Sequence, residues 1–394
     1  MPSSFVNRIF KANLGVLEVS SLSGSKAIRL PKSRGFRSVC CFRRASACHD
    51  EQASRLNGFS KHKRSDTLCV NQDFCKEPSI ARLLDDRRTV GIAALAAGIV
   101  CWGVTPVLLR RLTPFIDAWT ANGLRYPISA ILYWPLLWQL TRSGKLTLAL
   151  CTSCIVPALL STCGQVFWGL AMYDLPASEI GFLVRTSTAW AIIASMLLFP
   201  DERVLLKHPK FYLGLAMIVA GFLVMSLASG ESAVKTVHDI PQGNHTWGVT
   251  CILLSSAFFG LYIASIRFFI PDVNPMHAFS IVAQIVSVAM LIGLFARGDI
   301  AVIPKQTVFS WSLLIGSSIL GIGIGHILVY TAVQRLGASI TSSCQSVLPF
   351  ATVAVASVVL SERLTPQQWL GGITMIVGAF VLLSIKHKIV RPAD

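Results

Sequence analysis

Long apolar stretches separated by short polar loops fill the chain from about residue 87 onward. Each is close to the roughly 20 residues that an α-helix needs to cross the hydrocarbon core of a bilayer. The pattern therefore predicts an all-α integral membrane protein. Its ten transmembrane helices are expected at about 90–109, 118–139, 149–172, 177–199, 210–229, 247–269, 277–296, 310–333, 338–360 and 367–386.

The apolar pattern occurs twice. The string GQVFWGLAMYDLPAS, which begins at Gly164, matches GHILVYTAVQRLGAS, which begins at Gly325, at a separation of 161 residues (325 − 164). Both copies continue through an apolar stretch to a Glu-Arg pair, Glu202-Arg203 in the first and Glu362-Arg363 in the second. These matches indicate an internal duplication with a unit of about 160 residues.

Five helices per unit is an odd number, so the second unit has to enter the bilayer from the opposite side. The sequence thus predicts two inverted five-helix repeats, which can expose a shared central site to one face of the membrane and then to the other. The expected organisation is a basic N-terminal extension at 1–86, a first repeat at 87–229, a linker at 230–246, a second repeat at 247–386 and a C-terminal tail at 387–394.

Composition excludes a water-soluble domain, because the mean hydropathy is +0.61 and only 14% of residues are charged. The net charge of +16 does not predict nucleic-acid binding, since the basic residues lie in the first 90 residues and in short loops without interleaved aromatic residues. The expected partners are the lipid bilayer and a small-molecule substrate.

The N-terminal extension has a composition of its own. Up to His49 its only acidic residue is Glu18, among many arginines, lysines and serines. This composition is typical of an organelle transit peptide, and a disordered tail or a misassigned start site are the alternatives. The protein is accordingly expected in a plasma (inner) membrane or, with a transit peptide, in a plastid membrane. Basic residues in alternate loops favour both termini inside.

Charged residues within membrane helices are rare and are functional candidates by default. Arg185 lies in the fourth predicted helix, and its repeat partner in the ninth is Gln345 or Ser346. A position that is polar in both copies and charged in one predicts the wall of a substrate cavity. The alternatives are an arginine that snorkels to the interface or is tied to Glu179.

A second repeated polar position pairs Gln165 with His326. It predicts either cavity-lining residues or side chains that are hydrogen-bonded locally between helices. Trp102, Trp168 and Tyr262 are expected to supply aromatic walls for a planar or amphipathic metabolite, with an interface belt as the alternative. Arg125, two turns inside the second helix, is predicted to anchor that helix at the headgroups rather than to attract an anionic solute.

No motif of a common enzyme class occurs in the sequence: there is no P-loop, HExxH, GxSxG or paired-carboxylate pattern. Cys151 and Cys154 form a CxxC, but it lies in an apolar helix without a second CxxC, which favours packing over metal or redox chemistry. No catalytic residue, metal site or cofactor is therefore expected. Glu179, Asp174 and His326 could carry protons, although the sequence pairs none of them.

Several strings resemble the drug/metabolite transporter superfamily, specifically its EamA type. They are CWGVTP at 101–106, LRYP at 124–127, and ASITSSCQSVLPFATVAVASVVLSERLT in the ninth helix, with Pro349 at mid-helix. The resemblance implies a ten-helix inverted-repeat carrier of small metabolites. It places the following residues in or near a central path: Trp102, Gln165, Arg185, Tyr262, His326 and Gln345. The fourth helix departs from the family pattern, because Thr188 and Ala189 stand where a proline is expected.

These observations predict a secondary-active transporter of small polar organic metabolites that works by alternating access through a central cavity. The metabolite is expected to be polar and could be anionic, with Arg185 as the counter-charge. A passive channel on the same scaffold is the first alternative. An integral-membrane enzyme or receptor is the second, and it would require a catalytic cluster or a folded extramembrane domain.

Overall fold

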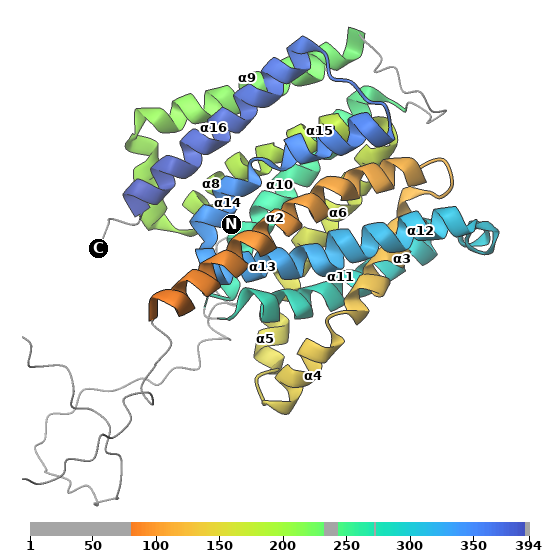
Figure 1. Ribbon diagram of the computed structural model, residues 1–394, viewed down its shortest axis with the longest axis horizontal. Coiled ribbons are helices and arrows are strands. Elements are labelled where there is room, and N and C mark those ends of the chain that lie inside the picture. The colour runs from red at the N-terminus through yellow and green to blue at the C-terminus, as the bar shows by residue number, and fades with distance from the viewer. Residues whose placement is uncertain (1–79, 232–242, 272, 391–394) are drawn as a thin grey trace, which may run out of the picture. The chain divides into compact units, whose positions relative to one another are not determined.

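The computed structural model describes residues 80–231, 243–271 and 273–390 of the 394-residue chain (Figure 1). The expected N-terminal extension and most of the linker between the repeats lie outside these residues. Side-chain positions are described for 88–228 and for 243–385 apart from two residues.

Ten helical segments follow one another in the described residues. They are α2 (Ile80–Leu112), α3 (Ala118–Ile131) with α4 (Trp134–Arg142), α5 (Leu148–Ser153) with α6 (Ile155–Asp174), α7 (Ala177–Leu183) with η2 (Val184–Thr186) and α8 (Ser187–Leu198), α9 (Pro209–Glu231), α10 (His245–Phe269), α11 (Pro275–Arg297), α12 (Val308–Ser317) with η5 (Ser318–Ile324) and α13 (Gly325–Leu336), α14 (Ala338–Gln345) with α15 (Leu348–Val359), and α16 (Pro366–Val390). Two short 3₁₀ turns, η3 (Pro200–Lys207) and η4 (Ile300–Lys305), lie between them.

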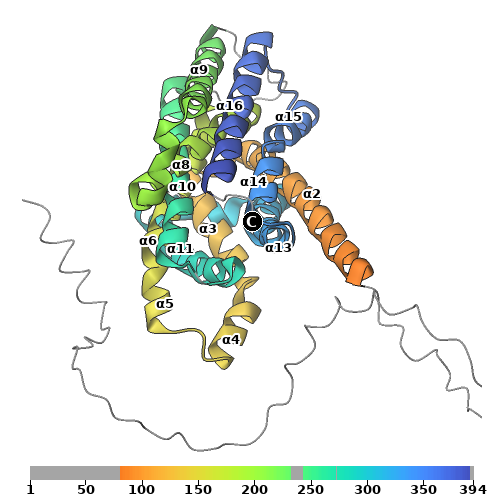
Figure 2. The same ribbon diagram turned by 90° about the vertical axis from the view of Figure 1, so that its left-hand side faces the viewer.

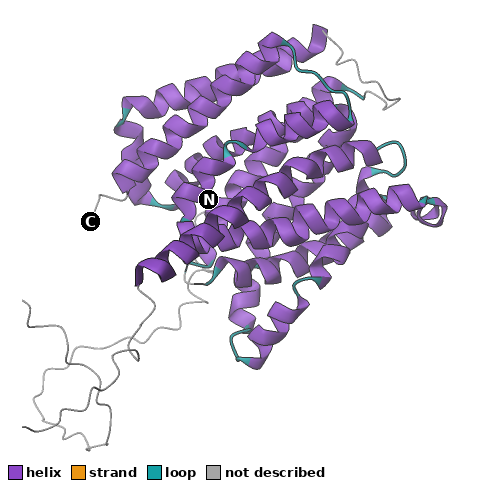
Figure 3. Cartoon of the chain, viewed as in Figure 1, coloured by secondary structure: helices purple, strands orange, loops and turns teal. Residues whose placement is uncertain are grey.

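Nine of these segments in the described part of the chain are long and apolar enough to span a membrane. The tenth, α3 with α4, is divided at Leu132 and Tyr133 and so does not form one continuous span. The predicted all-α membrane fold with about ten helices is confirmed, and every regular element in the described ranges is helical (Figure 3).

Packing occurs mainly between the two halves. α2 packs against α13 and α15, whereas α10 packs against α6 and α8, which are the repeat counterparts of those two helices. α3 packs on α11, and α9 lies alongside α16 at one edge of the bundle in both views (Figures 1 and 2). The contact pattern is therefore the same when the two halves are exchanged.

The two halves run in opposite directions through the bundle. Gly91 near the start of α2 faces Leu336 at the end of α13, and Thr105 near the end of α2 faces Gly321 just before α13, so α2 and α13 are antiparallel. α10 precedes α13 by two crossings and runs the same way as α13. The first helices of the two halves are consequently antiparallel, which is the inverted arrangement that the odd helix count predicts.

A carboxylate from the second half holds the start of the fourth helix. Glu362 is 1% exposed and accepts hydrogen bonds from the Ala177 amide at 3.1 Å, the Ser178 amide at 2.8 Å and the Ser178 hydroxyl at 2.6 Å. The first amides of a helix have no partner within it and carry partial positive charge, so a carboxylate there stabilises the helix. This contact ties the Ala-Ser string of the first repeat to the Glu-Arg string of the second.

A second cap lies at the start of α3, outside the spanning segments. Asp117 accepts hydrogen bonds from the amides of Trp119 at 2.9 Å, Thr120 at 3.0 Å and Asp299 at 3.2 Å, and it thereby ties α3 to the end of α11. Burial raises the pKa of Asp117, but the hydrogen bonds to Thr120, Asp299 and Trp119 outweigh it, and the pKa is lowered from its ordinary value.

Replacement of Glu362 by alanine should destabilise the protein by about 2 kcal/mol, because three donors at the start of α7 lose their charged acceptor. Thermal denaturation in detergent should show a lower Tm for Glu362→Ala. The control is Arg363→Ala, which alters the adjacent exposed residue and should change stability by less than about 0.5 kcal/mol. Equal Tm values for the two variants would contradict the capping role.

Asp117 should stabilise the fold only while it is ionised. A lowered folded-state pKa means that this contribution is present above the unfolded value of about 3.9 and is lost as pH falls through the folded value. The Tm difference between wild type and Asp117→Asn should therefore be largest near neutral pH and shrink in acid. Asp201→Asn, at an exposed aspartate of η3, is the control, and a pH-independent difference for Asp117→Asn would refute the prediction.

Candidate functional site

The fourth and ninth helical segments are interrupted at matching repeat positions near their middle. η2 spans Val184–Thr186, and adding 161 gives 345–347, where α14 ends and a turn precedes α15. Pro349 in the first turn of α15 accounts for the second interruption. The first occurs without a proline, since Thr188 stands at the equivalent position. Irregular backbone at membrane depth is tolerated where it is buried in protein or lines a cavity.

Arg185 lies in the interruption of the fourth segment and points across to the ninth. Its side chain is half-buried, and Nη1 donates to the backbone oxygen of Gln345 at 3.4 Å. Its Nε is buried and has no hydrogen-bond partner among the described residues. The predicted alternative of a tie to Glu179 is not observed, because Glu179 bonds to His245 instead. The two interruptions are thus linked by an arginine with one long bond to a neutral acceptor.

Trp102 and His326 meet at the π-helical turn η5 of the eighth segment. Trp102 Nε1 donates to the Gly321 oxygen at 2.9 Å, and His326 Nδ1 lies 3.0 Å from the same oxygen. The imidazole stacks on Phe279 with ring centres 4.2 Å apart and meets the Trp102 ring edge-on at 5.0 Å. The polar tips of both side chains are therefore engaged with backbone, which is the local hydrogen bonding that the sequence left open for His326.

A stripe of donors on α3 and at the start of α4 bonds to further carbonyl groups in η5 and just before it. Arg125 donates to the Ser317 oxygen, Ser129 to the Ser318 oxygen at 2.7 Å, and the Tyr133 hydroxyl to the oxygens of Ile322 and Gly323 at 2.7 and 2.8 Å. Arg125 and Ser129 are four apart and share one face of α3, and Tyr133 follows in the turn between α3 and α4. This stripe was missed in the sequence, where polar residues at intervals of four in an apolar helix were the available signal.

Arg125 is not at the headgroups, and the predicted anchoring role is wrong. The side chain is 1% exposed, with Nε bonded to the Ser317 hydroxyl at 3.0 Å and Nη1 to the Asn122 side-chain oxygen at 3.1 Å. A guanidinium two turns inside a membrane helix is stable when polar groups of neighbouring helices surround it. Here it joins the second and eighth segments.

The remaining predicted site residues lie on α6 and α10. Tyr262 is half-buried beside Tyr330, and their hydroxyls interact. Gln165 and Trp168 are half-buried on α6; the Gln165 backbone oxygen accepts from Asn122 at 3.3 Å. Among the described residues no hydrogen bond or ring contact joins Gln165 or Trp168 to Arg185 or His326.

Charged pairs between the halves lie at both ends of the bundle. Arg267 at the end of α10 pairs with Glu202, and Arg110, at the matching position of α2 (267 − 157), interacts electrostatically with Glu362. Arg110 also donates to the Met172 oxygen and is 1% exposed, whereas the Arg267 side chain is 50% exposed. We call these ends the Arg110 face and the Arg267 face.

The duplicated, inverted arrangement corresponds to a known protein family. A model described as the EamA-like transporter family matches residues 89–227 and again residues 246–384. The chain belongs to the EamA-like transporter family. The resemblance seen in the sequence is confirmed, and membership supports a multi-pass membrane transporter.

Two relatives of this EamA-like chain are named uncharacterized transporters. One, from Haemophilus influenzae, is 24% identical over 203 residues, which is 50% of this chain and 63% of the relative. The other, from Methanothermobacter thermautotrophicus, is 23% identical over 230 residues, which is 58% of this chain and 63% of the relative. The chain thus spans just under two thirds of the length of each.

A third relative matches over a stretch about as long as one repeat. It is an uncharacterized protein of Methanocaldococcus jannaschii, 30% identical over 137 residues, and the match covers 34% of this chain and 94% of the relative. The match agrees with a duplicated chain whose unit is a single EamA-like repeat.

Loss of the Tyr133 hydroxyl should destabilise this EamA-like fold by about 1–2 kcal/mol, because two buried carbonyl groups of η5 lose their donor. Thermal denaturation of Tyr133→Phe in detergent measures the loss. Tyr212→Phe is the matched control: its hydroxyl also donates to a backbone oxygen, that of Leu206, but the residue is 55% exposed, and water can replace it. Equal effects of the two substitutions would contradict the proposed support of η5.

Proposed function

We propose that this EamA-like protein is a secondary-active transporter of small polar organic metabolites, and that its substrates carry a carboxylate or phosphate group. The observation that supports this substrate class is Arg185. It is a half-buried cation inside the membrane region with one long hydrogen bond to a neutral oxygen and a buried Nε without a partner among the described residues.

The chemistry of the guanidinium group favours an anionic substrate. A planar guanidinium presents two parallel donors that match carboxylate and phosphate oxygens, and such charge-assisted pairs are about twice as strong as neutral hydrogen bonds. A cation in a low-dielectric setting is costly unless it is compensated. A substrate anion would supply that compensation during transport, whereas a purely structural arginine such as Arg125 already has its acceptors in the protein.

The position of Arg185 between the halves supports alternating access. Its acceptor among the described residues is Gln345, at the matching interruption of the other repeat, so a group bound there would contact both halves at once. Inverted repeats that rock about such a site expose it to each face in turn. We place Gln345 and Gln165 in the polar part of this path, and the aromatic residues Trp102, Tyr262, Trp168 and His326 in its walls.

Transport should depend on the charge of Arg185. In proteoliposomes that contain unlabelled substrate, Arg185→Gln should lower counterflow of small carboxylates and phosphate esters at least about tenfold, because the ion pair with the substrate is lost. Arg185→Lys keeps the charge but not the planar donor pair and should retain part of the activity. Uptake of radiolabelled compounds from a panel of such anions measures the effect.

Arg142→Gln is the matched control, because Arg142 is an exposed arginine that lies over the ring of Trp138. It should leave counterflow unchanged. Undiminished counterflow with Arg185→Gln would remove the charge hypothesis. A wild-type protein that passes these anions without acceleration by internal substrate would instead favour a channel over a carrier.

A further inference from the structure

A buried carboxylate lies between the halves at the Arg110 face, away from Arg185. Glu179 in α7 has a side chain that is 0% exposed. Its Oε1 lies 3.1 Å from Nε2 of His245, the first residue of α10. Its Oε2 is buried without a hydrogen-bond partner among the described residues. One oxygen of this carboxylate is therefore paired with a titratable group, and the other has no hydrogen-bond donor among the described residues, although the group lies in the first turn of α7.

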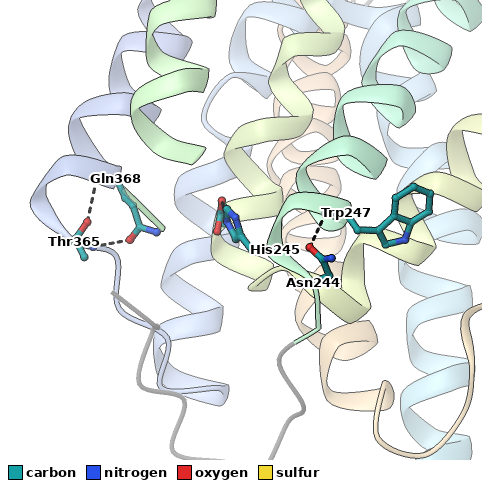
Figure 4. Close-up of polar contacts among 6 residues, drawn as sticks. Asn244, His245, Trp247, Thr365 and Gln368 are labelled. Carbon is teal, nitrogen blue, oxygen red and sulfur yellow. Dashed lines mark hydrogen bonds and ion pairs between the residues drawn. The ribbon is translucent and has the colours of Figure 1, made fainter. Parts of the chain in front are cut away.

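His245 connects this buried group to the surface. Its side chain is 31% exposed, and it follows directly on Asn244, whose side chain caps the same helix by accepting from the Trp247 amide at 3.2 Å (Figure 4). Histidine is the side chain that changes charge between about pH 5 and pH 8. The pair thus has an imidazole open to solvent on one side and a buried carboxylate on the other.

The charged groups around the pair favour a bound proton. Asp174 of α6 accepts from the Asn244 amide at 2.8 Å, Arg110 of α2 interacts with both Asp174 and Glu362, and Glu362 after α15 bonds to residues 177 and 178 just before Glu179. When His245 is neutral, the carboxylates of Asp174, Glu179 and Glu362 are balanced among the described residues of this region by the single guanidinium of Arg110. A proton shared by His245 and Glu179 reduces that excess of negative charge.

We propose that the Glu179–His245 pair is the proton-binding site of this transporter and that proton movement at this site drives its conformational change. The inference rests on the proposed carrier function. Glu179 lies on α7 of the first half and His245 is the first residue of α10, the first helix of the second half, so closure of the Arg110 face brings them together and opening separates them. The ligand of this site is a single proton taken from water and returned to water.

The number of protons bound per closure follows from the cost of burying the charged Glu179 carboxylate. In the closed arrangement one proton, held by His245 or by Glu179, makes the pair neutral overall, and a buried neutral pair is stable. Without that proton the pair carries a net negative charge at a buried carboxylate, which favours separation of the halves and hydration of Glu179. Closing the Arg110 face therefore takes up one proton and opening releases one proton.

The test measures opening of the Arg110 face directly and needs no substrate. Spin labels are attached at Phe115→Cys, between α2 and α3, and at Thr246→Cys on α10; both positions are exposed. The full-length protein, with its native cysteines replaced, is placed in lipid nanodiscs. Pulsed electron paramagnetic resonance then measures the distance between the two labels. As the pH rises from about 5 to about 9, the distance between the two labels should change from short to long in the protein with Glu179 and His245 intact. The midpoint should lie in the range in which histidine titrates.

Two substitutions assign the transition to the pair. Glu179→Gln mimics the protonated carboxyl and should keep the short distance at every pH. His245→Gln removes the imidazole that lies against Oε1 of Glu179 and should shift the midpoint out of the range in which histidine titrates. His277→Gln, at a half-exposed histidine in the first turn of α11, is the matched control and should behave as wild type.

A distance that does not change with pH in the wild type overturns the proposal, and so does a Glu179→Gln variant that keeps the wild-type transition. If Glu179→Gln does not fold, as judged by its elution from size exclusion in detergent, the His245→Gln midpoint decides: an unshifted midpoint overturns the proposal. These readouts are independent of counterflow, so a failure here leaves the carrier function standing, and a failure of counterflow does not alter them.

Discussion

The constraint on which this structure depends is that a backbone group released from a helix inside lipid must find its partner within the protein. Several of the helical segments are interrupted, and each interruption releases carbonyl or amide groups. Side chains from other segments meet them: the α3 stripe of Arg125, Ser129 and Tyr133 serves η5, and Arg185 reaches the end of α14. The interruptions are therefore what ties the segments together.

Most of these contacts cross from one half to the other. Glu362 of the second half caps α7 of the first, and Glu202 of the first half pairs with Arg267 of the second. These contacts are discrete hydrogen bonds and ion pairs that lie beside an apolar cluster shared by the two halves, and a few of them can be exchanged at one face without unfolding either half. The alternating access that we propose requires such an exchange between two arrangements of the halves.

Hydropathy and internal repetition predict the ten helical segments, their approximate limits and the opposite orientation of the two halves. All three depend only on the lengths and order of the apolar stretches. The interruptions do not follow from the pattern, since η2 forms without proline and η5 is a π-helical turn in an apolar run. Arg125 illustrates the consequence: its depth suggested a headgroup anchor, but its partners come from a segment nearly 200 residues away. The pairing of Glu179 with His245 is hidden for the same reason.

The central claim is that a polar seam between inverted halves opens to each side of the membrane in turn. A single cysteine in place of Gln345, in a background without other cysteines, tests it by reaction with a membrane-impermeant maleimide added to one side of sealed proteoliposomes or to the other. The account predicts labelling from both sides. Labelling from one side only, or from neither, would contradict it.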